Sequence, residues 1–102
     1  MKIAVIFGGT GTERDVSIVS GTSVLKNSDK SKYEILPLYI DKNGEWFEYT
    51  KDIRKIEIAN IGDEITEIRK IENVMETLKE QDVLFPVLHG LGGEDRNNPR
   101  LI

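Results

Sequence analysis

The sequence predicts an α/β fold built on a parallel sheet, and three observations support this prediction. Two apolar runs, residues 2–7 (KIAVIF) and 82–90 (DVLFPVLHG), lead directly into glycines, as buried strands of a parallel sheet do before their loops. The segments follow the order strand, helix, strand, helix, strand. The length of 102 residues fits a single domain.

The first helix is predicted over residues 13–26, after a glycine loop. Thr12 and Asp15 have capping-box-like spacing, in which side chains satisfy free N–H groups at the start of a helix. Valines at roughly helical spacing predict the face that packs on the sheet: Val16, Val19 and Val24.

A second strand is predicted over residues 32–41. Pro37 has no N–H group to donate, so we expect this strand to lie at an edge of the sheet, or Pro37 to lie at a strand end. Residues 41–44 (DKNG) have the composition of a turn, and residues 45–49 alternate enough to form a short hairpin arm.

The segment from Thr50 to Lys70 is charged, and its isoleucines favour neither a helical nor a strand period. It can hold short strands or an irregular insertion, and its topology stays open. Residues 71–81 predict a second helix, because apolar side chains return at helical spacing: Val74, Met75 and Leu78.

Composition excludes several classes of function. A net charge of -4 and a pI near 5.0 argue against a nucleic-acid partner, which needs clustered Lys and Arg. The absence of cysteine excludes disulfides and thiolate metal sites. The apolar stretch at the N-terminus is too short for a signal peptide or a membrane span. We therefore expect a cytoplasmic protein with no nucleic-acid or membrane partner.

Ligands of open parallel sheets bind beyond the carboxyl ends of the strands. Two loops here meet that condition, residues 8–14 (GGTGTER) and 89–95 (HGLGGED). If their strands are parallel neighbours, both loops face one crevice.

Glu13 and His89 are the residues of these loops best suited to chemistry. A carboxylate in the first turn of a helix is kept ionised by the helix dipole and can hold a substrate ammonium, or it can only complement the dipole, worth about 0.3–1 kcal/mol. His89 is the one histidine of the chain and follows an apolar strand. It is either a hydrogen-bonded structural residue or a donor to a carboxylate. Glu94 and Asp95 can bind a cation or form a solvated turn.

A dinucleotide site is the competing interpretation of the first loop. Gly9 and Gly11 match the start of G-x-G-x-x-G, and Asp41 is placed to bind a ribose. Arg14 occupies the position of the third glycine, where close packing of helix and strand excludes a side chain. The lysine of a P-loop is absent as well.

Taken together, the two loops resemble the D-alanine–D-alanine ligases. KIAVIFGGTGTERDVSIVSGTSVL resembles the first strand, Gly-Gly loop and Glu-x-(Glu/Asp)-Val-Ser helix of that family, and VLFPVLHGLGGED resembles its His-Gly-x-x-Gly-Glu-Asp-Gly motif. The match is good over residues 2–41 and 82–95 and poor between them. The resemblance implies a Rossmann-like, three-layer domain over residues 1–95, of the kind that precedes an ATP-grasp module, with a small, truncated sheet.

The resemblance also implies an activity. In this family ATP, held with Mg²⁺ by later domains, phosphorylates the carboxylate of one D-alanine, and the amine of a second D-alanine attacks the acyl phosphate. Carried over to this sequence, Glu13 is the catalytic-site residue that binds the ammonium of the first D-alanine. Val16 and Ser17 lie beside that subsite, and His89 helps to orient the same alanine.

The family pattern stops at Arg96. One nucleotide inserted after the codon of Asp95 would turn the family's Gly-Thr-Ile-Gln-Gly-Leu into the observed Arg-Asn-Asn-Pro-Arg-Leu-Ile, so we expect residues 96–102 to be a frameshifted tail.

We expect this chain alone to bind neither ATP nor Mg²⁺, to bind D-alanine weakly or not at all, and to lack ligase activity. An uncovered sheet edge predicts a homodimer or other self-association. The alternative is a stand-alone Rossmann-like module that binds a nucleotide or phosphate, or that dimerises.

Overall fold

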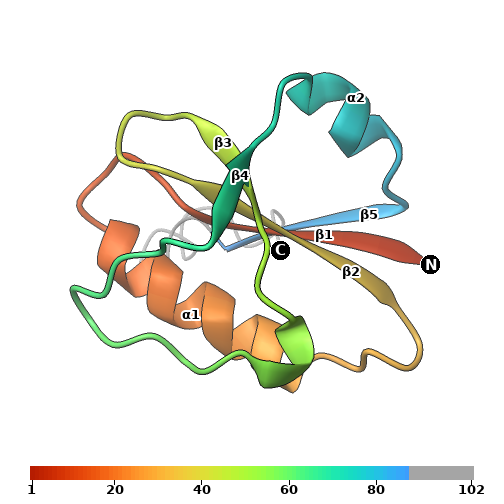
Figure 1. Ribbon diagram of the computed structural model, residues 1–102, viewed down its shortest axis with the longest axis horizontal. Coiled ribbons are helices and arrows are strands. Elements are labelled where there is room, and N and C mark those ends of the chain that lie inside the picture. Colours follow the sequence, from red (N-terminus) through yellow and green to blue (C-terminus); the bar gives the residue numbers. More distant parts are fainter. Residues whose placement is uncertain (88–102) are drawn as a thin grey trace, which may run out of the picture.

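A computed structural model describes residues 1–87 and shows a mixed sheet of five strands in the order β4-β3-β2-β1-β5 (Figure 1). The strands are β1 (Lys2–Gly8), β2 (Glu34–Ile40), β3 (Trp46–Tyr49), β4 (Ile68–Lys70) and β5 (Val83–Val87). The helices are α1 (Arg14–Asn27), the short 3-10 helix η1 (Ile53–Lys55) and α2 (Val74–Lys79). The predicted α/β fold is confirmed.

The parallel part of the sheet is formed by β1 with its two neighbours. Phe7 of β1 pairs with Tyr39 of β2 on one side and with Val87 of β5 on the other. β3 and β4 extend the sheet in antiparallel pairing, and β3 returns from β2 through the predicted turn. Because β1, β2 and β5 are parallel, their carboxyl ends lie at one end of the sheet.

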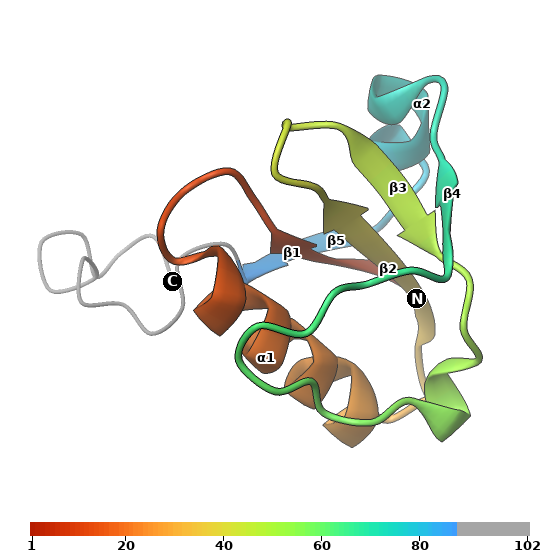
Figure 2. The ribbon, with the colours of Figure 1, turned by 60° about the vertical axis from the view of Figure 1, so that its left-hand side comes forward.

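The continuous apolar run of β1 is explained by burial on both faces. Val5 and Phe7 belong to a core cluster with Ile18 of α1, whereas Ala4 and Ile6 belong to a cluster on the opposite face. Leu78 of α2 packs against that second cluster. Figure 2 shows α1 and α2 on opposite sides of the sheet. The arrangement is the three-layer one that the sequence predicts.

The buried face of α1 differs from the predicted valine face. The helix buries a set that is partly polar: Ser17, Ile18, Gly21, Thr22 and Leu25. Val16 is 42% exposed, so the prediction that it packs on the sheet is wrong. Val24 does pack against the core cluster, as predicted. The contacting face also includes small residues, because α1 approaches β1 closely at Gly21.

Pro37 does not mark an edge, because β2 lies between β1 and β3. Backbone groups of alternate residues point to opposite neighbours in a sheet. The carbonyl of Ile40 accepts from the N–H of Gly9, so even-numbered residues of β2 face β1 and Pro37 faces β3. Pairing with β3 runs only from Leu38 to Ile40. The missing N–H therefore costs no ladder hydrogen bond.

The segment between β3 and β4 runs along α1 (Figure 2). The N–H of Ala59 donates to Oγ1 of Thr22 at 2.9 Å, and Ile56 is buried in the same core cluster as Ile18. The open topology of this segment is thus resolved as η1, an irregular stretch and the short strand β4.

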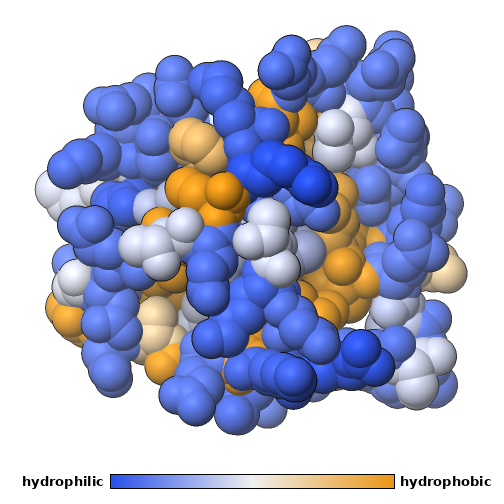
Figure 3. Space-filling view, in the orientation of Figure 1, coloured by the Kyte–Doolittle hydropathy of each residue, from blue (hydrophilic) through white to orange (hydrophobic). Residues whose placement is uncertain are grey.

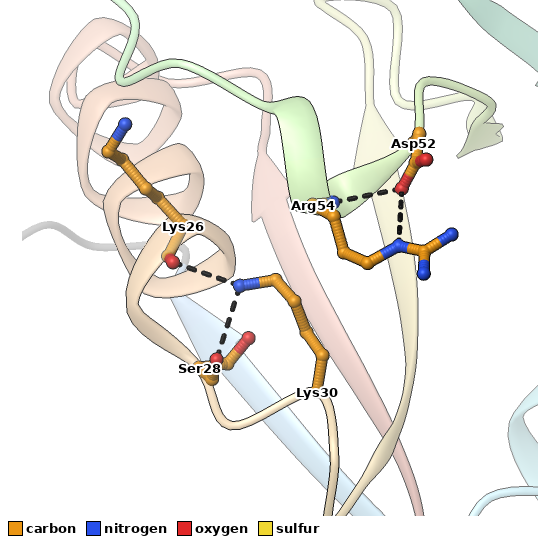
Figure 4. A network of polar contacts seen from close by, with 5 residues as sticks. All are labelled: Lys26, Ser28, Lys30, Asp52 and Arg54. Carbon is orange, nitrogen blue, oxygen red and sulfur yellow. Dashed lines mark hydrogen bonds and ion pairs between the residues drawn. The ribbon is translucent and has the colours of Figure 1, made fainter.

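Figure 4 shows how polar side chains close the end of α1 and the start of η1. Nζ of Lys30 donates to the carbonyls of Lys26 and Ser28 at 2.9 and 3.1 Å, which satisfies acceptors left over at a helix C-terminus. Oδ1 of Asp52 accepts from N and Nε of Arg54, which caps η1.

β5 is an edge strand and is less buried than the sequence predicts. Val83, Leu84 and Phe85 are 41%, 46% and 48% exposed. Figure 3 shows further apolar side chains at the surface beside α2. Self-association through such surface stays a prediction. Within residues 1–87 there is no helix with the length and apolar character that a membrane span requires.

A substitution at Gly21 tests the close packing of α1 against β1. A Cβ added there would lie 2.4 Å from Cβ of Phe7, whose ring is held between Tyr39 and Tyr49. Alanine in place of glycine normally stabilises a helix by about 1 kcal/mol. The clash is larger, so we expect Gly21→Ala to lower the free energy of unfolding by about 1–3 kcal/mol in urea titrations. The control Ser23→Ala should change it by less than about 0.5 kcal/mol, and a stabilising Gly21→Ala would contradict the packing described.

Candidate functional site

A hollow of about 340 Å³ lies where β1 ends and α1 begins. It is lined by the glycine loop of residues 8–11, by Glu13 and Arg14, and by Ile40 at the end of β2. This is the carboxyl end of the parallel strands, where ligands of open sheets bind. The first of the two predicted loops is therefore in a position to form a site.

The glycine loop has a backbone path that side chains would block. Gly8 has a φ of 98°, and a Cβ there would lie 2.3 Å from the carbonyl oxygen of Ile40. Gly9 has a φ of 121°, a conformation that L-residues rarely adopt. The chain can therefore leave β1 against the end of β2 and turn at once into α1.

Glu13 is the N-cap residue of α1, and its side chain makes no capping hydrogen bond. The predicted capping box of Thr12 and Asp15 does not form. Glu13 is exposed, and Oε1 would lie 3.6 Å from a Cβ placed on Gly11. No ion pair involves this carboxylate in the described part of the chain. The positive end of the helix dipole stabilises its charge, which is directed to the loop that lines the hollow.

Ser17 lies beneath the loop and is fully buried. Its Oγ accepts from the N–H of Gly8 at 2.9 Å and donates to the carbonyl of Val87. Ser17 thus joins the ends of β1 and β5. Val16 lies on the exposed side of α1 and does not line the hollow.

Arg14 is a residue of the site that sequence reasoning missed. Its Nη1 donates to the carbonyls of Gly9 and Ile40 at 3.2 and 3.4 Å, and its Nη2 donates to the hydroxyl of Tyr39. The guanidinium carbon lies 5.3 Å from the centre of the Tyr39 ring. The signal in the sequence is an arginine at the position where a dinucleotide loop has its third glycine.

His89 lies outside the described residues, so its distance from Glu13 stays a prediction, and so does the character of residues 96–102. The position of Val87 bears on it indirectly. Val87 is the last residue of β5, pairs with Phe7 and is bonded to Ser17. Strand β5 therefore ends, at Val87, at the end of the sheet that carries Glu13.

A second hollow of about 240 Å³ lies on the other side of Arg14. Its lining includes side chains of both charges, among them Asp15, Asp41 and Lys42. Within residues 1–87 no group of three or more His, Asp or Glu side chains is placed to hold a metal ion.

Comparison with known proteins identifies the family. The family model described as the D-ala D-ala ligase N-terminus matches residues 2–97. The chain belongs to this family. The segment from Thr50 to Lys70, where the motifs fade, is included in the match.

Curated relatives are longer than this chain. The D-alanine–D-alanine ligase of Clostridium novyi (strain NT) is 53% identical over 96 residues, which are 92% of this chain and 27% of the relative. That of Caldicellulosiruptor bescii is 40% identical over 105 residues, with 93% and 29% covered. The chain thus spans less than a third of the length of these ligases.

A solved structure agrees with the fold. The VanG D-Ala:D-Ser ligase from Enterococcus faecalis superimposes with a TM-score of 0.65 at 36% identity, covering 92% of this chain and 30% of that one. The predicted resemblance to the N-terminal domain of the ligase family is confirmed.

Gly8 and Gly11 form a matched pair for testing the loop. Gly8→Ala adds both a backbone clash and a left-handed conformation, so we expect it to lower the free energy of unfolding by about 1–3 kcal/mol. Gly11→Ala meets only an ordinary contact with Glu13 and should change it by less than about 0.5 kcal/mol. Thermal or urea unfolding of both variants measures the difference, and equal losses would contradict the described path of the loop.

Proposed function

We propose that this chain supplies the N-terminal, substrate-binding part of a D-alanine–D-alanine ligase, in which Glu13 binds the ammonium group of the first D-alanine. The observation that carries the proposal is the position of the Glu13 carboxylate. It lies at the N-terminus of α1, takes no part in capping, and lines the hollow beside the glycine loop. A carboxylate at this place, without an ion-pair partner among the described residues, is suited to an ammonium group.

The other site residues support that contact in different ways. Ser17 holds the ends of β1 and β5 together beneath the loop. Val16 follows Glu13 by three residues on the first turn of α1, outside the hollow itself, so its place beside the subsite is part of the proposal. His89 orients the same D-alanine, which the approach of β5 toward this end of the sheet supports. Together they fix the amino end of the substrate, so that its carboxylate points away from this domain toward the rest of the enzyme.

Residues 1–87 do not fit a nucleotide or Mg²⁺. The negative charge of Glu13 lies at the N-terminus of α1, where a phosphate would otherwise bind, and no described cluster is placed to hold a metal ion. In the proposed enzyme ATP and Mg²⁺ belong to the remaining part of the longer relatives, and we expect neither to bind this chain alone. The same charge weighs against the alternative of a stand-alone phosphate-binding module.

A chimeric protein tests the proposal. In this chimera residues 1–87 replace the matching segment of the Clostridium novyi ligase. The ligation of D-alanine is measured through the phosphate that is released from ATP. We expect an active enzyme in which Glu13→Gln raises the KM for the first D-alanine about 10- to 100-fold, as loss of a charged hydrogen bond predicts. The KM for ATP should stay unchanged.

Asp15→Asn is the matched control. Asp15 is also an exposed carboxylate near the start of α1, but it lines the second hollow instead of the first. We expect its removal to leave the KM for D-alanine within about two-fold, since a surface change without a partner costs little. An inactive chimera that is folded, or equal effects of the two substitutions, would overturn the proposed role of Glu13.

A further inference from the structure

We propose that Arg14 is a positioning residue that holds the loop of residues 9–13 in the shape that presents Glu13. The structural part of this inference stands by itself, and its consequence for the substrate rests on the proposed function. Arg14 is the first residue of α1 and is half-buried, whereas Glu13 before it is exposed. A charged side chain that turns inward at this point needs polar partners, and the contacts supply them.

The guanidinium joins three parts of the site. Nη1 donates hydrogen bonds to the carbonyl of Gly9 in the loop and to the carbonyl of Ile40 at the end of β2, and Nη2 donates one to the hydroxyl of Tyr39. The face of the group lies over the Tyr39 ring. Both terminal nitrogens are engaged, which favours a role in holding the loop over a role as a direct ligand.

These hydrogen bonds link both ends of the loop to the same residue of β2. The N–H of Gly9 donates to the carbonyl of Ile40 at 2.9 Å, and Arg14 bonds both that carbonyl and the carbonyl of Gly9. The two ends of the loop are thereby tied to one point on β2. Glu13 directly precedes Arg14, so the direction of its side chain depends on where this tie holds the start of α1.

The pattern requires arginine in particular. A planar guanidinium can bond several oxygens and lie against an aromatic ring at the same time, whereas the ammonium of lysine is a compact charge without a face to stack. Arg14→Lys therefore keeps the charge and removes the fork. Tyr39→Phe keeps the ring and removes one acceptor.

Hydrogen exchange in the 102-residue chain tests directly whether the hydrogen bonds of Arg14 hold the loop. The amide of Gly9 donates to the carbonyl of Ile40, which Arg14 also binds, whereas the amide of Gly8 donates to Oγ of Ser17, which receives no hydrogen bond from Arg14. We expect Arg14→Lys to speed exchange at Gly9 on the order of ten-fold and to leave Gly8 unchanged, because only the local opening becomes easier. Tyr39→Phe should give a smaller change at the same amide, and Asp15→Asn none.

The result that would overturn the inference is unchanged exchange at Gly9 in Arg14→Lys. Equal acceleration at Gly8 and Gly9 would overturn it too, because it would show a general loss of stability instead of a local one. The melting temperature of each variant separates a local from a general effect.

The chimera tests the consequence for the substrate. We expect Arg14→Lys to raise the KM for the first D-alanine on the order of ten-fold, since misplacing a binding group weakens the contact it makes. The KM for ATP should not change, and on the Glu13→Gln background Arg14→Lys should have no further effect. An additive effect there would show that Arg14 does not act through Glu13. A chimera without activity would refute the proposed function and leave the exchange result at Gly9 to decide the role of Arg14.

Discussion

The close passage of Gly8 beside the carbonyl of Ile40 is the constraint on which the site depends. No side chain fits at that point, and the backbone has a positive φ there. β1 can therefore end against β2 and turn within a few residues into α1. Because the turn is short, the N-terminus of α1 lies at the carboxyl end of the sheet, and Glu13 lies with it.

Close packing beneath the loop preserves this geometry. Gly21 allows α1 to approach Phe7, and the buried hydroxyl of Ser17 bonds both β1 and β5. Polar groups inside a core are costly unless they are bonded, so the hydroxyl of Ser17 specifies one relative position of helix and strands. The same domain thus combines a closely packed base with an exposed carboxylate, an arrangement suited to positioning a small substrate.

The parts of the fold that could be predicted are those set by local pattern. The apolar run of β1 indicated burial on both faces, and the turn at Gly44 indicated the hairpin of β2 and β3. The position of Glu13 at the start of α1 could be predicted, because a glycine loop followed by a helical pattern shows where the helix begins. Residues 50–70 could not be predicted, because some of their isoleucines pack against the core cluster that contains Ile18 of α1 whereas Ile58 and Ile61 are exposed, and the two kinds follow no single period.

The features that could not be predicted arise from contacts between distant segments. Tyr39 meets Arg14 across 25 positions of the sequence, and no local spacing signals that contact. The valine pattern of α1 was only partly right, because Val24 packs on the core whereas Val16 is exposed and the small residues Ser17 and Gly21 make the close contact with β1. The prediction that Pro37 marks an edge strand was wrong, because β3 is shorter than β2 and does not reach Pro37. The missing N–H group therefore faces no partner strand.

A crystal structure of the chimeric ligase with D-alanine bound would show directly whether Glu13 holds the substrate. We expect the amine nitrogen to lie within about 2.7–3.2 Å of the Glu13 carboxylate, in the hollow beside the glycine loop. A D-alanine whose amine is held elsewhere, with Glu13 facing only solvent, would contradict it.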